Sequence, residues 1–257
     1  MSLAFCVLAS GSKGNSTVIT NGSKAILVDC GITARQAVLR MEARGVDPSS
    51  VQAIVLTHEH TDHIAGVRVL TKRLGCKVLA TRGTFSKMEG IDLPDKEIFI
   101  PGRSFDEAGF SIRPFDISHD AEEPVGLTIS QNGVKIGFAT DLGCTTNVVR
   151  QRLAQCRGLI VEANHDPAML TSSHYPEWLK QRVRSRQGHL SNQQGAELVA
   201  EVGHADLACV VQAHLSENTN RPELAEKDLG QVIDQALSNT RTLVASQKEP
   251  TDLIILK

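Results

Sequence analysis

Four residues able to bind a metal ion stand within six positions of this chain, directly after the apolar run at 54–56. They are His58, His60, Asp62 and His63. Neutral imidazole and carboxylate are ligands that zinc, manganese and iron accept. His58 and His60 alternate on an expected extended segment, so their rings point to one side, whereas the neighbouring side chains of Asp62 and His63 diverge and suit a second ion. A polar loop between strand and helix would explain each residue alone but not the cluster, and the spacing therefore predicts two divalent metal ions (Zn, Mn or Fe).

Residues 58–63, with the order HEHTDH, resemble the signature of the metallo-β-lactamase fold superfamily. The resemblance implies an α/β fold, namely a four-layer αββα sandwich with a two-metal site along one edge of its paired sheets. It also implies how the ligands divide between the ions. His58, His60 and His119 would hold one ion, Asp62, His63 and His214 the second, and Asp141 would bridge both.

Five apolar stretches expected as strands each end in a residue that can bind a metal or transfer a proton. These residues are His58, His119, Asp141, Glu162 with His165, and His214. Sites in α/β sheets collect beyond the carboxyl ends of strands, where loops are free to converge, so we expect one shared site. Taken singly, His119 and His214 could be ordinary strand-end histidines, and Asp141 a turn residue. Five such endings in one chain favour the shared site.

The expected chemistry is hydrolysis. Two ions about 3.5 to 4 Å apart can share a water molecule and lower its pKa from 15.7 to about 7, which gives a bridging hydroxide at neutral pH without a protein base. Protonation of the leaving group then remains. Glu162 and His189 are candidates, since a carboxylate beside an imidazole fixes its tautomer and raises its basicity. We expect Asp62, Glu162 and His189 as catalytic residues, although His189 could also be a surface histidine flanking a helix.

Five blocks of sequence together resemble the YycJ/WalJ (VicX-like) group of the superfamily. They are residues 8–16 (LASGSKGNS), 57–60 (THEH), 162–166 (EANHD), 188–192 (GHLSN) and 214–218 (HLSEN). The group is associated with 5′ to 3′ exonuclease activity on DNA and a role in repair. The resemblance therefore implies nucleic acid, in particular DNA, as the substrate. The chain lacks room between Asp141 and His214 for the large inserted clamping domain of some nuclease relatives.

Two stretches are candidates for binding that substrate. The turn at 10–17 is rich in small residues, but it lacks the G-x-x-x-x-G-K-[ST] order of a nucleotide loop, so we expect a hairpin turn near the mouth of the site. The run at 180–186 has four basic residues, with Tyr175 and Trp178 just before it. It could bind phosphates and stack a base, although such a run is more often a solvated helix face. The expected substrate-binding residues are Ser12, Asn15, His165, Lys180, Arg184 and Asn218.

Composition limits the remaining choices. The chain has 257 residues, a formal charge of −2 and 41 % hydrophobic residues, which suits one hydrolase domain over 1–257 without a global attraction to nucleic acid. The six cysteines are widely spaced, and no apolar run approaches a membrane span, so we expect a soluble cytoplasmic protein with no membrane partner. The oligomeric state stays open.

Three other functions compete with a nuclease. A small-molecule phosphodiesterase, or a thioester or lactone hydrolase, would use the same fold. A flavodiiron oxidoreductase would resemble an H-x-E-x-D pattern, with a carboxylate where His60 stands. An interaction module without turnover would leave the pair of Glu162 and His189 idle.

The apolar patterns predict the elements that position these residues. Expected strands are 3–9, 24–30, 53–57, 77–81, 96–100, 110–118, 125–130, 134–140, 158–163, 208–213 and 251–256. Expected helices are 34–44, 64–74, one around 148–153, 175–186, 192–202 and 223–238. Asn132-Gly133 predicts a type I′ hairpin turn, and Ser191 or Asn192 an N-cap.

Overall fold

Two seven-stranded sheets form the centre of the protein in a computed structural model, which describes residues 2–257, with the backbone alone at 234–236. The first sheet has the order β14-β1-β2-β3-β4-β5-β6 and the second β13-β12-β11-β10-β9-β8-β7. The first contains β1 (Ala4–Ala9), β2 (Ser16–Thr20), β3 (Ala25–Val28), β4 (Val51–Val55), β5 (Lys77–Ala80), β6 (Lys96–Ile98) and β14 (Ile254–Ile255). The second contains β7 (Phe105–Glu107), β8 (Phe110–Asp116), β9 (Val125–Gln131), β10 (Val134–Ala139), β11 (Gly158–Glu162), β12 (Cys209–Ala213) and β13 (Arg241–Val244).

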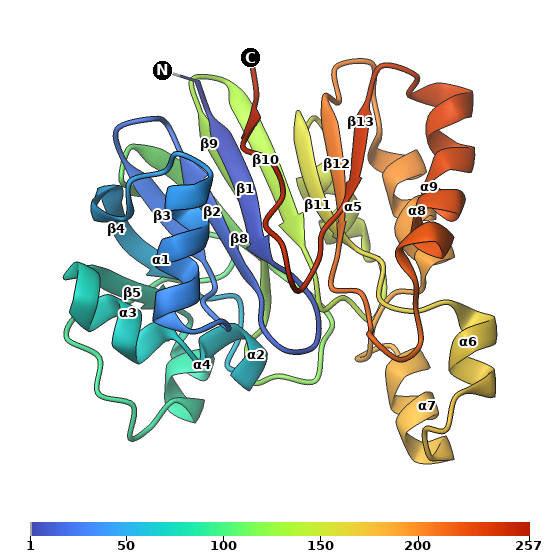
Figure 1. Ribbon diagram of the computed structural model, residues 1–257, viewed down its shortest axis with the longest axis horizontal. Helices are drawn as coiled ribbons and strands as arrows, with labels where there is room; N and C mark the ends of the chain where they lie inside the picture. Colours follow the sequence, from blue (N-terminus) through green and yellow to red (C-terminus); the bar gives the residue numbers. More distant parts are fainter. Residues whose placement is uncertain (1) are drawn as a thin grey trace.

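Helices cover the outer face of each sheet (Figure 1). Beside the first sheet lie α1 (Ala34–Ala43), α2 (Thr61–Ile64), α3 (Val67–Leu74) and α4 (Arg82–Lys87), with a 3-10 helix at Pro48–Ser50. The second half of the chain contributes α5 (Asn147–Leu153), α6 (Pro167–Ser172), α7 (Glu177–Arg184), α8 (Asn192–Val202) and α9 (Pro222–Ala236). The four-layer αββα sandwich is confirmed.

Three apolar clusters correspond to the three interfaces between these layers. One lies between the sheets and includes Phe5 of β1 and Phe110 of β8, both fully buried. The second packs the first sheet against α1 and α3 through residues such as Met41. The third packs the second sheet against α5, α8 and α9 through residues such as Leu229. Burial of strand faces on both sides explains why the strands are nearly continuous apolar runs.

The two sheets repeat one plan. In the first, β14, β1, β2 and β3 pair antiparallel, whereas β3, β4, β5 and β6 pair parallel. In the second, β7 to β10 pair antiparallel, whereas β10 to β13 pair parallel. The loops that follow β4, β10, β11 and β12 therefore leave the carboxyl ends of parallel strands, where sites collect.

Most expected elements are present with shorter bounds, and the helix expected at 64–74 is divided into α2 and α3. The reason is a pair of backbone bonds to other loops. The carbonyl of Asp62 accepts from the amide of Asn15 at 2.7 Å, and the amide of Gly66 donates to the carbonyl of Cys30 at 2.8 Å. The bond that would continue the helix from Gly66 to Asp62 is thus replaced. Gly66 suits this contact, because a Cβ there would lie 2.0 Å from the carbonyl oxygen of Ile32.

The expected ranges leave out six short elements: β2, β7, β13, α4, α6 and the 3-10 helix at Pro48–Ser50. Each has three to six residues, too few for a period to show. The helix α6 carried a readable signal, since Asp166 caps it and Pro167 is its first residue. At the expected turn, Asn132 and Gly133 both have positive φ, 51° and 82°, which fits type I′.

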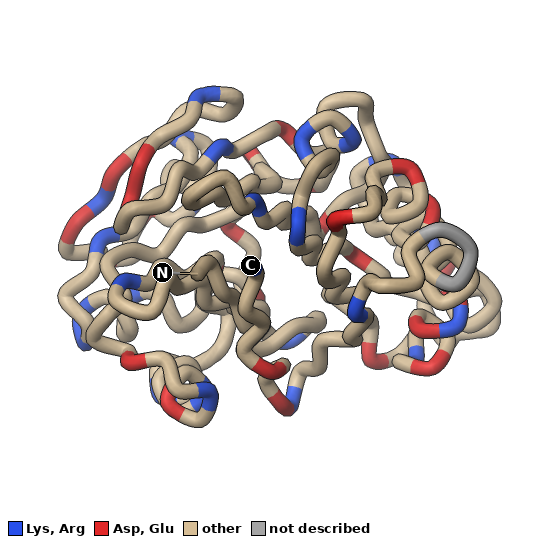
Figure 2. The backbone as a smooth tube through the Cα atoms, turned by 90° about the horizontal axis from the view of Figure 1, so that it is seen from above, with Lys and Arg blue, Asp and Glu red and all other residues tan. Residues whose placement is uncertain are grey.

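Charged residues of both signs are interspersed along the periphery (Figure 2), which agrees with the near-neutral formal charge. Among the described residues, none of the helices combines the length and the apolar character needed to cross a membrane.

Candidate metal centre

The loop after β4 brings four of the seven expected ligands to one place. The strand ends at Val55, and His58 and His60 lie on the extended segment before α2, for which His60 is the N-cap. Asp62 and His63 lie in the first turn of α2. Two backbone hydrogen bonds fix this turn. The amide of Asn15 donates to the carbonyl of Asp62 at 2.7 Å, and the amide of Cys30 donates to the carbonyl of His63 at 2.8 Å.

The other three ligands come one from each of three loops of the second sheet. His119 follows β8, Asp141 follows β10 and His214 follows β12. Asp141 and His214 have left-handed backbone, with φ of 58° and 60°, which is uncommon for residues other than glycine. Ser10 supports the second of these turns, because its hydroxyl accepts from the amide of His214 at 2.7 Å.

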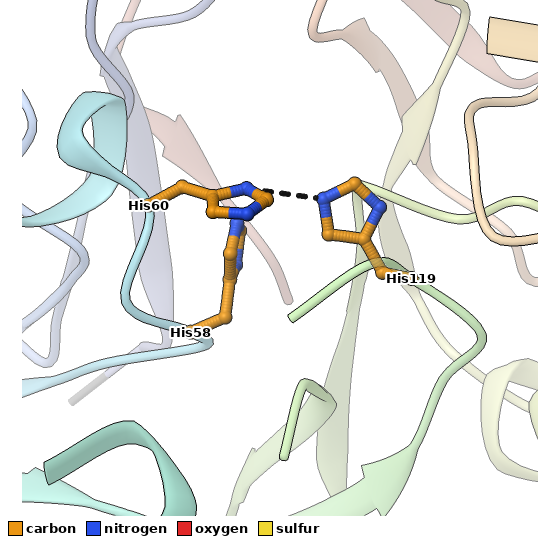
Figure 3. A group of neighbouring side chains, drawn as sticks. All are labelled: His58, His60 and His119. Carbon is orange, nitrogen blue, oxygen red and sulfur yellow. Dashed lines mark hydrogen bonds between the residues drawn. The ribbon is translucent and has the colours of Figure 1, made fainter. Parts of the chain in front are cut away.

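His58, His60 and His119 gather their ring nitrogens as the resemblance implied (Figure 3). Nδ1 of His60 lies 3.3 Å from Nε2 of His119, and the ring of His58 stands edge-on to both others. Two nitrogens bound tetrahedrally to one zinc at about 2.1 Å would lie about 3.4 Å apart. The observed separation therefore fits two ligands of one ion.

Asp62, His63 and His214 form a second set. Oδ2 of Asp62 lies 3.5 Å from Nε2 of His63 and 3.4 Å from Nε2 of His214. Asp141 stands between the sets, since its Oδ2 is 3.3 Å from Nε2 of His63 and its Oδ1 is 3.7 Å from Nε2 of His119.

Two buried polar atoms in this group lack a hydrogen-bond partner: Nε2 of His58 and Oδ2 of Asp141. A buried polar atom without a partner is costly, so these atoms are arranged for something else to bind. Together with the two ligand sets, they show that the residues present fit two divalent metal ions.

In four of the five candidate ligand histidines, the Nδ1 ring nitrogen contacts a group of the protein outside the seven expected ligands. Two of these contacts are to carboxylates: Nδ1 of His63 lies 2.8 Å from Asp29, and Nδ1 of His214 lies 3.0 Å from Glu162. The other two are to uncharged oxygens: Nδ1 of His119 lies 3.2 Å from the carbonyl of Gly188, and Nδ1 of His58 lies 3.0 Å from the hydroxyl of Thr57. Such contacts fix the ring and leave Nε2 for the ion. Sequence reasoning missed Asp29, although it stands at the end of an expected strand as the other site residues do.

Glu162 is a positioning carboxylate. It is fully buried, contacts Nδ1 of His189 at 2.8 Å and of His214 at 3.0 Å, and accepts from the amides of Leu142 and Leu190 at 2.8 and 3.0 Å. Burial raises the pKa of Glu162. The charge of His189 and the hydrogen bonds to His189 and His214 outweigh burial and lower this pKa to about 2. Glu162 thus stays ionised and holds the rings of both histidines.

The metal-free centre is a network of coupled charges. Burial raises the pKa of Asp141, but His214 and His63 outweigh burial and hold that pKa well below its usual range. Burial lowers the pKa of His214, but Asp141 and the bonds to Asp62 and Glu162 raise it to about 10. The pKa of His63 is also well above its usual range, because Asp141 and Asp29 outweigh burial. In the metal-free protein, protonated His63 and His214 therefore supply the positive charge beside Asp141 that metal ions would otherwise supply.

A pocket of about 230 Å³ opens onto both ligand sets. His60, Asp62, His119, Asp141 and His214 line it, as do His189 and Ser12. Tyr175, Leu179, Arg182 and Val183 also line the pocket. The sequence pointed to Tyr175 and to the basic run that contains Arg182, but to neither Leu179 nor Val183. Leu179 and Val183 carried a readable signal, since they lie four positions apart and share one face of α7 with Arg182.

The remaining expected substrate-binding residues lie outside the lining of this pocket. Asn15 is buried, and its amide bonds Gly11 at 3.1 Å and Asp62 at 3.1 Å. His165 is buried, and burial lowers its pKa to about 4. Lys180 and Arg184 both donate to Thr171 of α6, and Asn218 donates to the hydroxyl of Tyr175 at 3.0 Å. Their roles toward substrate stay predictions.

Comparison with known proteins identifies a family and two similar curated proteins. Residues 24–211 match the family described as the β-lactamase superfamily domain. The chain is 32 % identical over 239 residues to exodeoxyribonuclease YycJ of Bacillus anthracis, covering 91 % of this chain and 90 % of that protein. It is 33 % identical over 238 residues to exodeoxyribonuclease WalJ of Streptococcus pneumoniae, covering 90 % and 88 %.

Among solved structures, the metallo-β-lactamase fold protein YhfI from Bacillus subtilis is similar in fold. The TM-score is 0.75 at 16 % identity, and the similarity covers 98 % of this chain and 99 % of that one.

Proposed function

This chain belongs to the β-lactamase superfamily, and on that premise we propose that it is a dinuclear-metal-dependent phosphodiesterase acting on nucleic acid, a 5′ to 3′ DNA exonuclease with a role in repair. The observation that carries the proposal is the convergence of seven candidate ligand side chains from both sheets on one centre, five of which line the pocket. The two exodeoxyribonucleases align with nine-tenths of the chain, which supports nucleic acid as the substrate.

We assign the ligands to the two ions as the sequence resemblance implied. His58, His60 and His119 would hold one ion and Asp62, His63 and His214 the other, with Asp141 reaching both. When bound, two divalent ions (Zn, Mn or Fe) would supply an activated water for attack on phosphorus and neutralise charge on the phosphate oxygens.

His189 is suited to protonate the leaving oxygen. Glu162 contacts its Nδ1 at 2.8 Å, so the hydrogen on that nitrogen points to the carboxylate and Nε2 is left for other partners. The side chain is 18 % exposed and lines the pocket, where a departing oxygen would lie. A positioned acid of this kind contributes roughly 100-fold or more to a rate.

Several further roles belong to the same proposal. Ser12 lines the pocket and would contact the substrate there, whereas Lys180, Arg184, Asn218, Asn15 and His165 would act from outside its lining. The chain would form one hydrolase domain over 1–257, because the apolar cluster between the sheets has residues from both. The six cysteines are free thiols, which supports a reducing compartment such as the cytoplasm.

A second candidate function is a small-molecule phosphodiesterase, or a thioester or lactone hydrolase. The pocket volume of about 230 Å³ favours it, because that space holds a small ester more readily than a polymer. Salt dependence separates the two candidates, since binding of a polyanion weakens steeply as salt rises.

The test is cleavage of end-labelled DNA and RNA by protein loaded with Zn, Mn or Fe. We expect mononucleotides released from the 5′ end of DNA, with loss of cleavage in Asp62→Ala. The matched control is Asp92→Ala, which removes an exposed carboxylate that pairs with Lys72 at 2.6 Å. No phosphodiester cleavage with any of the three metals would contradict the proposal.

A further inference from the structure

The helix α7 places one cation in the metal pocket. Leu179, Arg182 and Val183 of α7 line this pocket, as does Tyr175 just before the helix, and Arg182 is the one lysine or arginine among the described residues that line it. Lys180 and Arg184 lie on the other side of the helix, where both donate to Thr171.

Backbone contacts lock the end of α7 against the loops that carry the site. The carbonyl of Arg186 accepts from the hydroxyl of Ser118 at 2.6 Å, and the carbonyl of Val183 accepts from the amide of His189 at 2.9 Å. A Cβ on Gly188 would lie 2.2 Å from the carbonyl oxygens of Arg182 and Val183, so only glycine permits this approach. The backbone of Arg182 is therefore fixed relative to His119 and His189.

Asp120 in turn holds the guanidinium. Nε of Arg182 donates to Oδ2 of Asp120 at 2.5 Å, and Asp120 directly follows the expected ligand His119. Within the described part of the chain, neither terminal nitrogen of Arg182 has a hydrogen-bond partner in the protein. An arginine held at Nε presents these two nitrogens as a planar fork that matches two oxygens of a phosphate.

We propose that Arg182 binds two non-bridging oxygens of the phosphodiester that is cleaved, with Asp120 fixing the orientation of its guanidinium. This inference rests on the proposed nuclease function and specifies how the pocket selects an anionic phosphodiester over a neutral ester. Charge that builds on those oxygens during attack is met by two pre-positioned donors. A lactone or thioester has no such pair of anionic oxygens, so Arg182 would add nothing to its cleavage.

The variants are Arg182→Gln, Arg182→Lys and Arg182→Ala, with Arg73→Gln, at an exposed arginine in the last turn of α3, as the matched control. The side chain of Arg182 is 51 % exposed, and exposed ion pairs contribute little to stability, so each variant should fold and bind metal as the wild type does. The substrates are a 5′-labelled oligonucleotide and bis(p-nitrophenyl) phosphate, a phosphodiester without bases. Thermal melting and metal content are measured for every variant.

We expect Arg182→Gln to lower kcat/KM about 100-fold on both substrates, and Arg73→Gln to change it less than about twofold. Lysine should not restore the rate, because an ammonium cannot form the fork. Guanidinium ions added to Arg182→Ala should raise its rate and leave the control unchanged, which a merely structural role would not produce.

The outcomes separate the two proposals. A wild-type protein that cleaves neither substrate overturns the nuclease function and this inference with it. Cleavage by the wild type with equal rates for Arg182→Gln and Arg73→Gln, or with no rescue by guanidinium, overturns this inference alone.

Discussion

The two sheets contribute to the centre in opposite ways. The first sheet supplies His58, His60, Asp62 and His63 from the single loop after β4, where local backbone geometry sets their spacing. The second supplies His119, Asp141 and His214 from three separate loops, so their spacing depends on how β8, β10 and β12 lie in the sheet. The same metal chemistry is thus local on one side of the pocket and depends on tertiary structure on the other.

Each half also provides one fully buried carboxylate behind the ligands. Asp29 holds Nδ1 of His63 and the hydroxyl of Thr57. Glu162 holds both His189 and His214 and accepts from the backbone amides of Leu142 and Leu190. Glu162 therefore fixes the relative positions of residues from separate loops, whereas in the loop after β4 the short chain segment itself fixes them.

The largest effect is expected at Asp141, which reaches both ligand sets. Asp141→Asn should lower kcat/KM by about 1,000-fold, because it removes a charge shared by two ions, and bound metal should fall from about two ions per chain toward one. Kinetics and elemental analysis measure this, with Asp92→Asn as the control. Full occupancy of both sites in Asp141→Asn would show that the halves do not share this residue.

The two buried carboxylates give the next largest effects. Glu162→Gln should reduce metal affinity or activity about 100-fold and Asp29→Asn about 10-fold, since outer partners of metal ligands contribute on this scale and Glu162 holds two rings. Metal titration with a competing chelator measures both. An equal loss at the two positions would contradict the difference drawn between the halves.

Metal affinity should rise with pH. The pKa of His214 is raised from its ordinary value of 6.5 to about 10 in the metal-free protein, so an ion must displace a proton there. The same protonated contacts stabilise the metal-free protein fully below pH 6.5, and this stabilisation is lost as the pH rises toward 10. Calorimetry in buffers of different ionisation enthalpy should show proton release, and uptake of protons would contradict the assignment.

The smallest effects are expected at two helix caps, one in each half. Thr33 caps α1, and Ser191 caps α8 in a capping box with Gln194. Replacement of either by alanine should lower the free energy of unfolding by about 1 kcal/mol. Denaturant unfolding of the metal-free protein measures this, and metal content should not change. A loss of metal in Ser191→Ala alone would show that the second half is the more sensitive one.

Sequence alone predicted the sandwich and the ligand candidates because both leave local patterns. The spacing within residues 58–63 indicates metal ligands, and apolar runs indicate the buried strands. The roles within the second half were less accessible, since nothing near Glu162 in the chain indicates that it holds His214, 52 positions away. Lys180 and Arg184 were chosen for charge alone, whereas the direction in which α7 faces, set by its contacts to His189 and Ser118, brings Arg182 to the pocket instead.

The left-handed backbone at Asp29, Asp141 and His214 bears on how the centre can be mutated. Their φ values of 59°, 58° and 60° cost an ordinary L-residue roughly 1 kcal/mol or more, whereas aspartate, asparagine and histidine tolerate them best. An alanine scan at these sites would mix a conformational penalty with the loss of a functional group. Asparagine, which is isosteric with aspartate, separates the two at Asp29 and Asp141, and variation at the three positions in evolving relatives should stay within the few residue types that this geometry admits.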